Sequence, residues 1–149
     1  MERKVNIIDQ NREQELHRAM ELFMFAYRAF TAEPDRMLEE RGLQRVHHRI
    51  LYFVGRNPGI SVNGLLGILA VSKQALNAPL RQLLGMELVE AQAPESDRRV
   101  RELRLTEKGK RLESALSKGQ CQMLEAVFRE VGKTAEAAWR DAMGRIAGD

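Results

Sequence analysis

The junction between two short helical patterns, at Ala70-Val71-Ser72, constrains the fold of this chain more than any other feature. The first pattern carries leucines at 65, 66 and 69, and Ser61 is placed to cap its start. The second begins after Ser72, another capping residue, and its leucines at 76, 80, 83 and 84 are spaced for one buried helix face. Three residues leave room only for a sharp turn, so the two segments predict a helix-turn-helix.

Beyond Gly85 the apolar period changes from that of a helix to that of a strand. Residues 88–92 and 101–105 are predicted to be two strands, with residues 93–97 as the turn between them. Thr106 is then placed to cap a long helix. A helix-turn-helix followed by such a hairpin indicates a winged helix.

The flanking segments carry long apolar stripes. Over residues 12–30 one stripe has a second apolar set beside it, formed by Ala19, Leu22, Ala26 and Ala29. The first helix therefore has two surfaces to bury, one of which suits a partner subunit. The members of the first stripe are Leu16, Met20, Phe23, Tyr27 and Phe30. Pro34 and Gly42 predict the start and end of a separate short helix, and Thr134 is placed to cap a final one. Residues 46–54 predict a further helix, which follows the short one.

These patterns predict a mainly α fold with a small β-hairpin, in which a winged helix-turn-helix lies between N- and C-terminal dimerisation helices. We expect a single domain over 1–149, with the winged helix at about 43–108 and the dimerisation helices at about 12–30 and 109–147.

The positive charge of the chain is concentrated at the hairpin. The whole chain has a formal net charge of +3, whereas residues 98–111 hold seven basic and two acidic residues, a net of +5. A basic hairpin tip can place an arginine in a narrow minor groove, where the negative potential is strongest. The clustering therefore favours double-stranded DNA as a partner over an ordinary solvated turn.

Lys73, Asn77 and Arg81 recur at helical spacing on the side of the second helix away from its leucines, with Gln74 beside them. Asn and Gln pair with adenine, Arg pairs with guanine, and Lys neutralises phosphate, so these residue types can read a major groove. Any exposed helix face can carry such residues, and that alternative stays open. Pro79 predicts a kink or local irregularity in this helix.

Four segments resemble the multiple-antibiotic-resistance-regulator (MarR) family of bacterial transcription factors. They are Ser72-Lys73-Gln74-Ala75-Leu76, residues 83–89, Asp97-Arg98-Arg99, and Leu105-Thr106-Glu107-Lys108-Gly109. The resemblance implies a homodimer on a pseudo-palindromic operator. It also implies a repressor that small aromatic or phenolic effectors, or oxidants, release.

The resemblance also implies roles for particular residues. Arg99 would enter the minor groove, and Asp97 would hold the wing in shape by pairing with a nearby arginine. The expected DNA-binding set is Ser72, Lys73, Gln74, Asn77, Arg81, Asp97, Arg98, Arg99 and Arg101. Family effectors bind between the dimer helices and the winged helix, and the residues expected to line that cleft are Met24, Tyr27, Arg28, His47 and Leu51.

The sequence contains no pattern that indicates catalysis, a cofactor or a metal. There is no nucleophile with a base, no paired carboxylates and no phosphate loop, so we expect no enzyme. The adjacent His47 and His48 point about 100° apart on a helix and cannot serve one metal. Cys121 is the single cysteine, which excludes an intrachain disulfide, fits a reducing cytosol, and is expected to be structural. No signal peptide or membrane span is recognisable, which predicts a cytoplasmic protein without a membrane partner.

The sequence thus predicts a ligand-responsive, sequence-specific transcriptional repressor. Two alternatives remain open at this level. One is a winged-helix adaptor that binds proteins without specific DNA binding, and the other is a redox or ligand sensor whose DNA binding is secondary.

Overall fold

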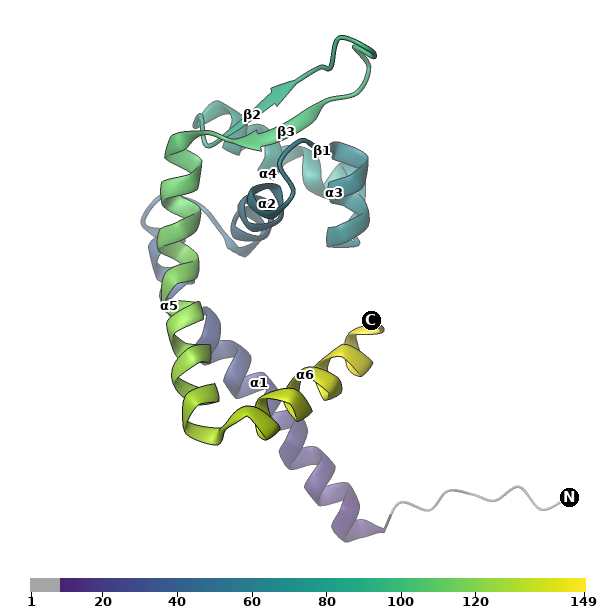
Figure 1. The fold of residues 1–149 in the computed structure, drawn as a ribbon, viewed down its shortest axis with the longest axis vertical. Helices are drawn as coiled ribbons and strands as arrows, with labels where there is room; N and C mark the ends of the chain where they lie inside the picture. The colour runs from purple at the N-terminus through teal and green to yellow at the C-terminus, as the bar shows by residue number, and fades with distance from the viewer. Residues whose placement is uncertain (1–8) are drawn as a thin grey trace, which may run out of the picture.

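The computed structural model describes residues 9–149. The first eight residues of the expected domain lie outside this range. The described part of the chain is helical with one small sheet, and the expected fold class is confirmed (Figure 1). In chain order the elements are α1 (Gln10–Glu39), α2 (Arg45–Arg56), β1 (Ile60–Ser61), α3 (Val62–Leu69), α4 (Lys73–Gly85), β2 (Val89–Gln92), β3 (Glu102–Leu105), α5 (Glu107–Val131) and α6 (Lys133–Ala147).

Side-chain caps fix where the central helices begin. The hydroxyl of Ser61 accepts the backbone N–H of Gly64 at 3.0 Å, and that of Ser72 accepts the N–H of Ala75 at 3.1 Å. Each cap satisfies a donor that the first helical turn leaves unpaired. Ala70 adopts the left-handed conformation, with φ +52°, which ends α3 and turns the chain into α4. The predicted helix-turn-helix is therefore present.

The first helix differs from the prediction, because α1 continues through Pro34 and no separate short helix forms. A proline inside a helix leaves the carbonyl four residues earlier without its donor, which here is the carbonyl of Phe30. Gln120 of α5 supplies the missing hydrogen bond, since its Nε2 donates to the Phe30 carbonyl oxygen at 3.1 Å. The tertiary contact thus replaces the lost helical bond.

The sheet has the order β1-β3-β2, and both strand pairs are antiparallel. The predicted hairpin is present as β2 and β3, whereas β1 was not predicted. At the base of the hairpin, Thr106 donates its N–H to the Leu88 carbonyl at 3.1 Å and its hydroxyl hydrogen to the Glu87 carbonyl at 2.6 Å. A Cβ at Gly109 would overlap the Leu88 carbonyl oxygen, so only glycine lets α5 approach β2 this closely.

The hydrophobic core is centred on the winged helix and includes the end of α1 and the first half of α5. All fifteen buried hydrophobic side chains of the described range fall between Leu38 and Leu116. Most are leucines contributed by α2, α3, α4, β3 and the first half of α5. Most of α1, the second half of α5 and all of α6 therefore form arms outside this core.

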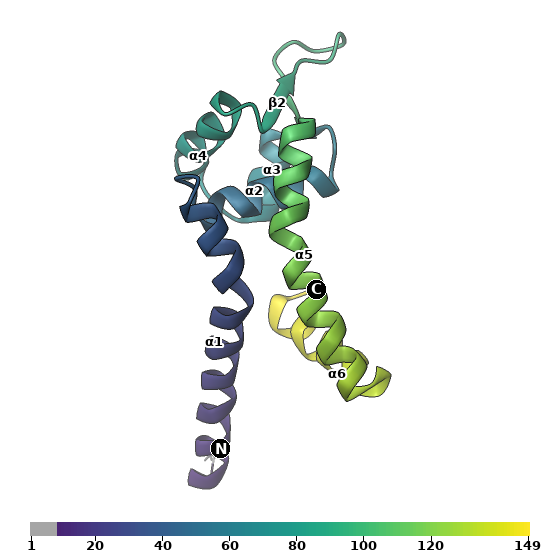
Figure 2. The same ribbon diagram turned by 90° about the vertical axis from the view of Figure 1, so that its left-hand side faces the viewer.

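The arms project from the winged helix, as the two views show (Figure 2). α6 begins directly after Gly132, so Thr134 lies inside the helix and is not its cap. None of the helices within residues 9–149 combines the length and apolar character that crossing a bilayer requires.

Candidate nucleic-acid interface

One face of α4 is free to meet a ligand. Leu76, Leu80 and Leu83 are buried, and all five residues expected to contact DNA from this segment are exposed. With about 100° per residue, Gln74 and Arg81 lie opposite the leucines, whereas Lys73 and Asn77 lie towards one side. The helix runs from Lys73 to Gly85 without a break, so Pro79 does not interrupt it. Arg81 therefore keeps its place on the outward face.

The wing presents its arginines to solvent. Arg98, Arg99 and Arg101 are exposed in the connection between β2 and β3, which extends beyond the sheet (Figure 1). Asp97 is exposed there as well, but within residues 9–149 it forms no ion pair with an arginine, contrary to expectation. Its Oδ1 instead accepts the backbone N–H of Arg99 at 2.9 Å. A short carboxylate side chain readily bonds the backbone two residues ahead, so Asp97 shapes the turn through the main chain.

The positive charge of this region is largely uncompensated. Of the seven basic residues between 98 and 111, Lys110 pairs with Glu107 at 3.1 Å. The three arginines of the wing tip form no ion pair with a residue that the structure describes. Unpaired surface cations displace counterions when they meet phosphates, which is the main electrostatic source of affinity for DNA.

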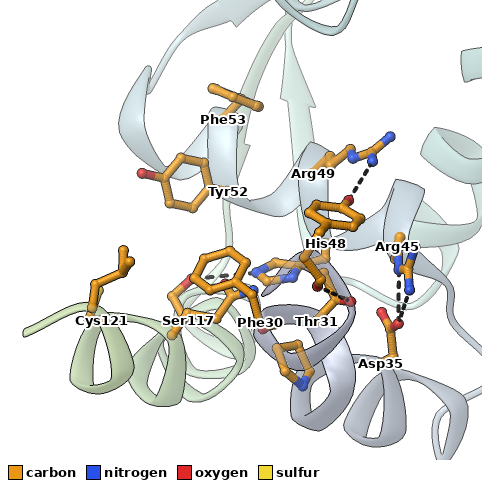
Figure 3. Close-up of a pocket in the computed structure, with 14 residues that line it drawn as sticks. Phe30, Thr31, Asp35, Arg45, His48, Arg49, Tyr52, Phe53, Ser117 and Cys121 are labelled. Atoms are coloured by element: carbon orange, nitrogen blue, oxygen red, sulfur yellow. Dashed lines mark hydrogen bonds and ion pairs between the residues drawn. The ribbon is translucent and has the colours of Figure 1, made fainter. Parts of the chain in front are cut away.

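A cavity of about 280 Å³ lies between α1, α2 and α5. Figure 3 shows aromatic and charged side chains from the three helices around this space. Its lining residues are Tyr27, Phe30, Thr31, Pro34, Asp35, Arg45, His48, Arg49, Tyr52, Phe53, Ser117, Gln120, Cys121 and Leu124. The cavity thus lies where α2 of the winged helix meets the arms.

Comparison with known proteins agrees with this geometry. The model of the MarR family matches residues 41–100. The regulator PetP of Rhodobacter capsulatus, named as a helix-turn-helix transcriptional regulator, is 42% identical over 131 residues, which cover 88% of the chain and 79% of PetP. The chain belongs to the MarR family. It is a DNA-binding transcriptional regulator of the helix-turn-helix type and not an enzyme.

Solved structures of MarR-like proteins share the fold. Streptococcus pneumoniae FabT, determined in complex with DNA, has a TM-score of 0.79 at 17% identity and matches 89% of this chain and 95% of its own. A MarR regulator of Methanosarcina mazei has a TM-score of 0.70 at 22% identity, with the same two shares of 89% and 95%. The arms and the winged helix of this chain therefore have the arrangement of the MarR fold.

The cavity of this MarR-family chain contains only one of the five residues expected to line an effector cleft. Tyr27 lines it, whereas Met24 and Arg28 are exposed elsewhere on α1. His47 and Leu51 are buried, with 5% and 0% of their surfaces exposed, and do not reach the cavity. The α2 face at the cavity is offset by one position from the predicted one and carries His48, Arg49 and Tyr52.

Two arginines of α2 frame the cavity. Arg45 pairs with Asp35 of α1 at 2.7 Å, and the hydrogen bond to this carboxylate raises the pKa of Arg45. Arg49 donates from Nη2 to the hydroxyl of Tyr27 at 3.0 Å and forms no ion pair with a residue in the 9–149 range. The guanidinium of Arg49 is therefore a positive charge at the rim of the cavity that no carboxylate in this range neutralises.

A chain of polar side chains centred on the buried Glu113 links α2 to α5 beside the cavity. Glu113 is 4% exposed, and its Oε1 accepts from the Ser117 hydroxyl at 2.7 Å and from Nη2 of Arg56 at 3.3 Å. Nε2 of His48 lies 3.4 Å from the same hydroxyl. Desolvation by burial lowers the pKa of His48, and the opposing effects of Glu113 and Asp35 are smaller. At neutral pH His48 is therefore neutral.

Cys121, expected to be structural, is exposed and belongs to the cavity lining. Sequence reasoning missed most of the other lining residues as well. The sequence carries one weak indication of the cavity face, because His48 and Tyr52 are four residues apart and so lie one turn apart on the same face of α2.

Proposed function

We propose that this protein is an effector-responsive repressor that acts as a homodimer on a pseudo-palindromic operator in the cytoplasm. The observation that carries the proposal is the division of the molecule into a winged helix with a complete core and arms whose apolar residues lie outside it. The winged helix supplies the surface that meets DNA, and the arms supply a surface for a second copy.

The arms expose many apolar side chains, which favours association with a second copy of the chain. Along α1, Met20 is 59% exposed and Phe23 49% exposed, and Val127 and Val131 of α5 are similarly open. In α6, no residue is buried at all. Large contiguous apolar surfaces of this kind mark sites of association, and a twofold dimer buries the same patch on both subunits.

In such a dimer, two copies of α4 would enter successive major grooves about 34 Å apart. Gln74, Asn77 and Arg81 would then face base edges, and Ser72 and Lys73 would face phosphates near the start of the helix. The wing would follow the backbone and place Arg99 in the neighbouring minor groove, with Arg98 and Arg101 near the phosphates.

The cavity between α1, α2 and α5 is the proposed effector site. Its volume is close to the lower end of the range for small-molecule pockets. Phe30 and Tyr52 offer faces for an aromatic ring, and Arg49 offers a cation for a phenolate or carboxylate. Because the cavity lies where α2 of the winged helix meets the arms, a ligand that fits one arrangement of these parts better would shift the population towards it.

The test is a fluorescence-anisotropy titration against operator DNA, first sought in the intergenic DNA beside the gene, with an unrelated duplex as the reference. Sedimentation of the free protein and of the complex gives the number of subunits. Arg99→Ala should weaken operator binding about 5- to 150-fold. Arg36→Ala provides the matched control, because Arg36 lies in the last turn of α1, pairs with Glu40 and is outside the expected DNA-binding set.

Operator binding by a dimer, weakened by Arg99→Ala and not by Arg36→Ala, is the expected result. Equal and weak binding to both duplexes would instead support the adaptor alternative, in which the basic surface has no operator to read. If a monomeric form bound the operator as tightly as the dimer does, the proposed role of the arms in dimerisation would be excluded.

A further inference from the structure

His47, buried at the start of α2, is hydrogen-bonded at both ring nitrogens. Its Nδ1 accepts the backbone N–H of Gln44 at 2.9 Å, which caps α2. Its Nε2 lies 2.9 Å from Oε1 of Gln82 on α4. The amide nitrogen of Gln82 in turn donates to the carbonyl of Gly42, between α1 and α2, at 3.2 Å. One histidine thus joins α2 to α4, the proposed recognition helix, and one glutamine joins α4 to the connection between α1 and α2.

The direction of each hydrogen bond follows from chemistry. An acceptor at Nδ1 carries no hydrogen, so the neutral ring has its hydrogen on Nε2 and donates to Gln82. Gln82 then accepts through Oε1 and donates through Nε2 to Gly42. All three bonds agree with one ring tautomer and one amide orientation, so that each donor in the chain faces an acceptor.

The first turn of α2 is also in contact with the cavity. Arg45, two residues before His47, lines the cavity and pairs with Asp35 of α1. The same helical turn is therefore connected to the cavity on one side and to the recognition helix on the other.

We propose that His47, acting through Gln82, is a positioning residue that sets the orientation of α4 for reading DNA. The inference rests on the proposed operator binding. His47 is 5% exposed and cannot touch DNA itself, whereas Gln82 lies at the edge of the exposed face of α4. A bond at that edge restrains rotation of the helix about its axis, and such a rotation would turn Gln74 and Arg81 away from the base edges.

The experiment compares His47→Asn, Gln82→Ala and the double variant. An asparagine oxygen replaces Nδ1 as the acceptor for Gln44, so His47→Asn keeps the cap of α2 and removes only the bond to Gln82. His17→Asn is the matched control, because His17 is exposed on α1. The readouts are affinity for the operator, affinity for an unrelated duplex, and the thermal unfolding midpoint.

Each single variant should lose about tenfold in operator affinity, and the double variant should lose no more than either single one. Binding to the unrelated duplex should stay unchanged, because phosphate contacts are not altered. The unfolding midpoint should fall by only a few degrees, because one buried hydrogen bond is lost, and should stay well above the assay temperature, so that a loss of folded protein does not account for the loss of affinity. His17→Asn should behave like the wild type.

A loss in Gln82→Ala without a loss in His47→Asn would overturn the proposal, since Gln82 would then act by contacting DNA or through its bond to Gly42, and not through His47. Losses that add in the double variant, or losses explained by a lower unfolding midpoint, would overturn it as well. If the wild type itself does not prefer the operator, the proposed operator binding fails and the positioning role fails with it. Normal operator preference in all variants refutes only the positioning role.

Discussion

Replacing Gly109 by alanine tests the close approach between α5 and the base of the wing. The added Cβ would overlap the carbonyl oxygen of Leu88, which is a main-chain atom and cannot rotate away. The start of α5 must therefore move, and the two bonds that Thr106 donates to Leu88 and Glu87 must lengthen or break.

The size of the effect follows from these contacts. Overpacking costs about 1–3 kcal/mol, and each weakened hydrogen bond costs about 0.5–1.5 kcal/mol. Alanine returns about 1 kcal/mol because it favours the helix more than glycine does. The free energy of unfolding should therefore fall by about 3 kcal/mol, within a range of about 1–5 kcal/mol.

Gly67→Ala is the control for this prediction. Gly67 also lies inside a helix, α3, but a Cβ there meets no atom within 4 Å. That variant should gain up to about 1 kcal/mol. Urea unfolding followed by circular dichroism, at one fixed protein concentration, measures both variants. A Gly109→Ala protein at least as stable as the wild type would refute the close approach.

Three further predictions concern binding, assembly and pH. Lys73→Ala should weaken binding to operator and unrelated duplex alike and reduce the salt slope by about 1, and a loss confined to the operator would show that Lys73 reads a base. Phe23→Glu places a charge on the apolar face of α1 and should convert the proposed dimer into a monomer in sedimentation, whereas an unchanged dimer would locate the interface elsewhere. Burial lowers the pKa of His48 below the ordinary value of 6.5, so the unfolded chain takes up this proton first. The contribution of His48 to stability is therefore complete above about pH 6.5 and is lost as the pH falls below it, and His48→Asn should make urea unfolding less dependent on pH across this range.

The features of the fold that were predictable are those determined by nearby residues. Ser61 and Ser72 cap the helices that they precede, and the spacing of the leucines in α4 matches their burial. The course of α1 was not predictable, because the donor that compensates for Pro34 comes from Gln120, far along the chain. β1 has only two residues, which is too short for an alternating pattern to be recognised.

The same distinction applies to the two candidate sites. The exposed face of α4 and the basic wing are each formed by one continuous segment, so their residues could be chosen from the sequence. The cavity is formed by three helices, and its residues depend on how those helices pack. The choice of His47 over His48 shows the consequence, since adjacent positions on α2 face the recognition helix and the cavity respectively.

The confinement of the core to residues 38–116 has a consequence for how proteins of this design can diverge. In the proposed dimer, the separation between the two winged helices depends on the arms, and the arms contribute no side chain to the core of either winged helix. Changes in the arms can then alter the spacing of the half-sites that are recognised, while each winged helix keeps its base preference. Operator spacing and operator sequence would be two independently adjustable properties of one short chain.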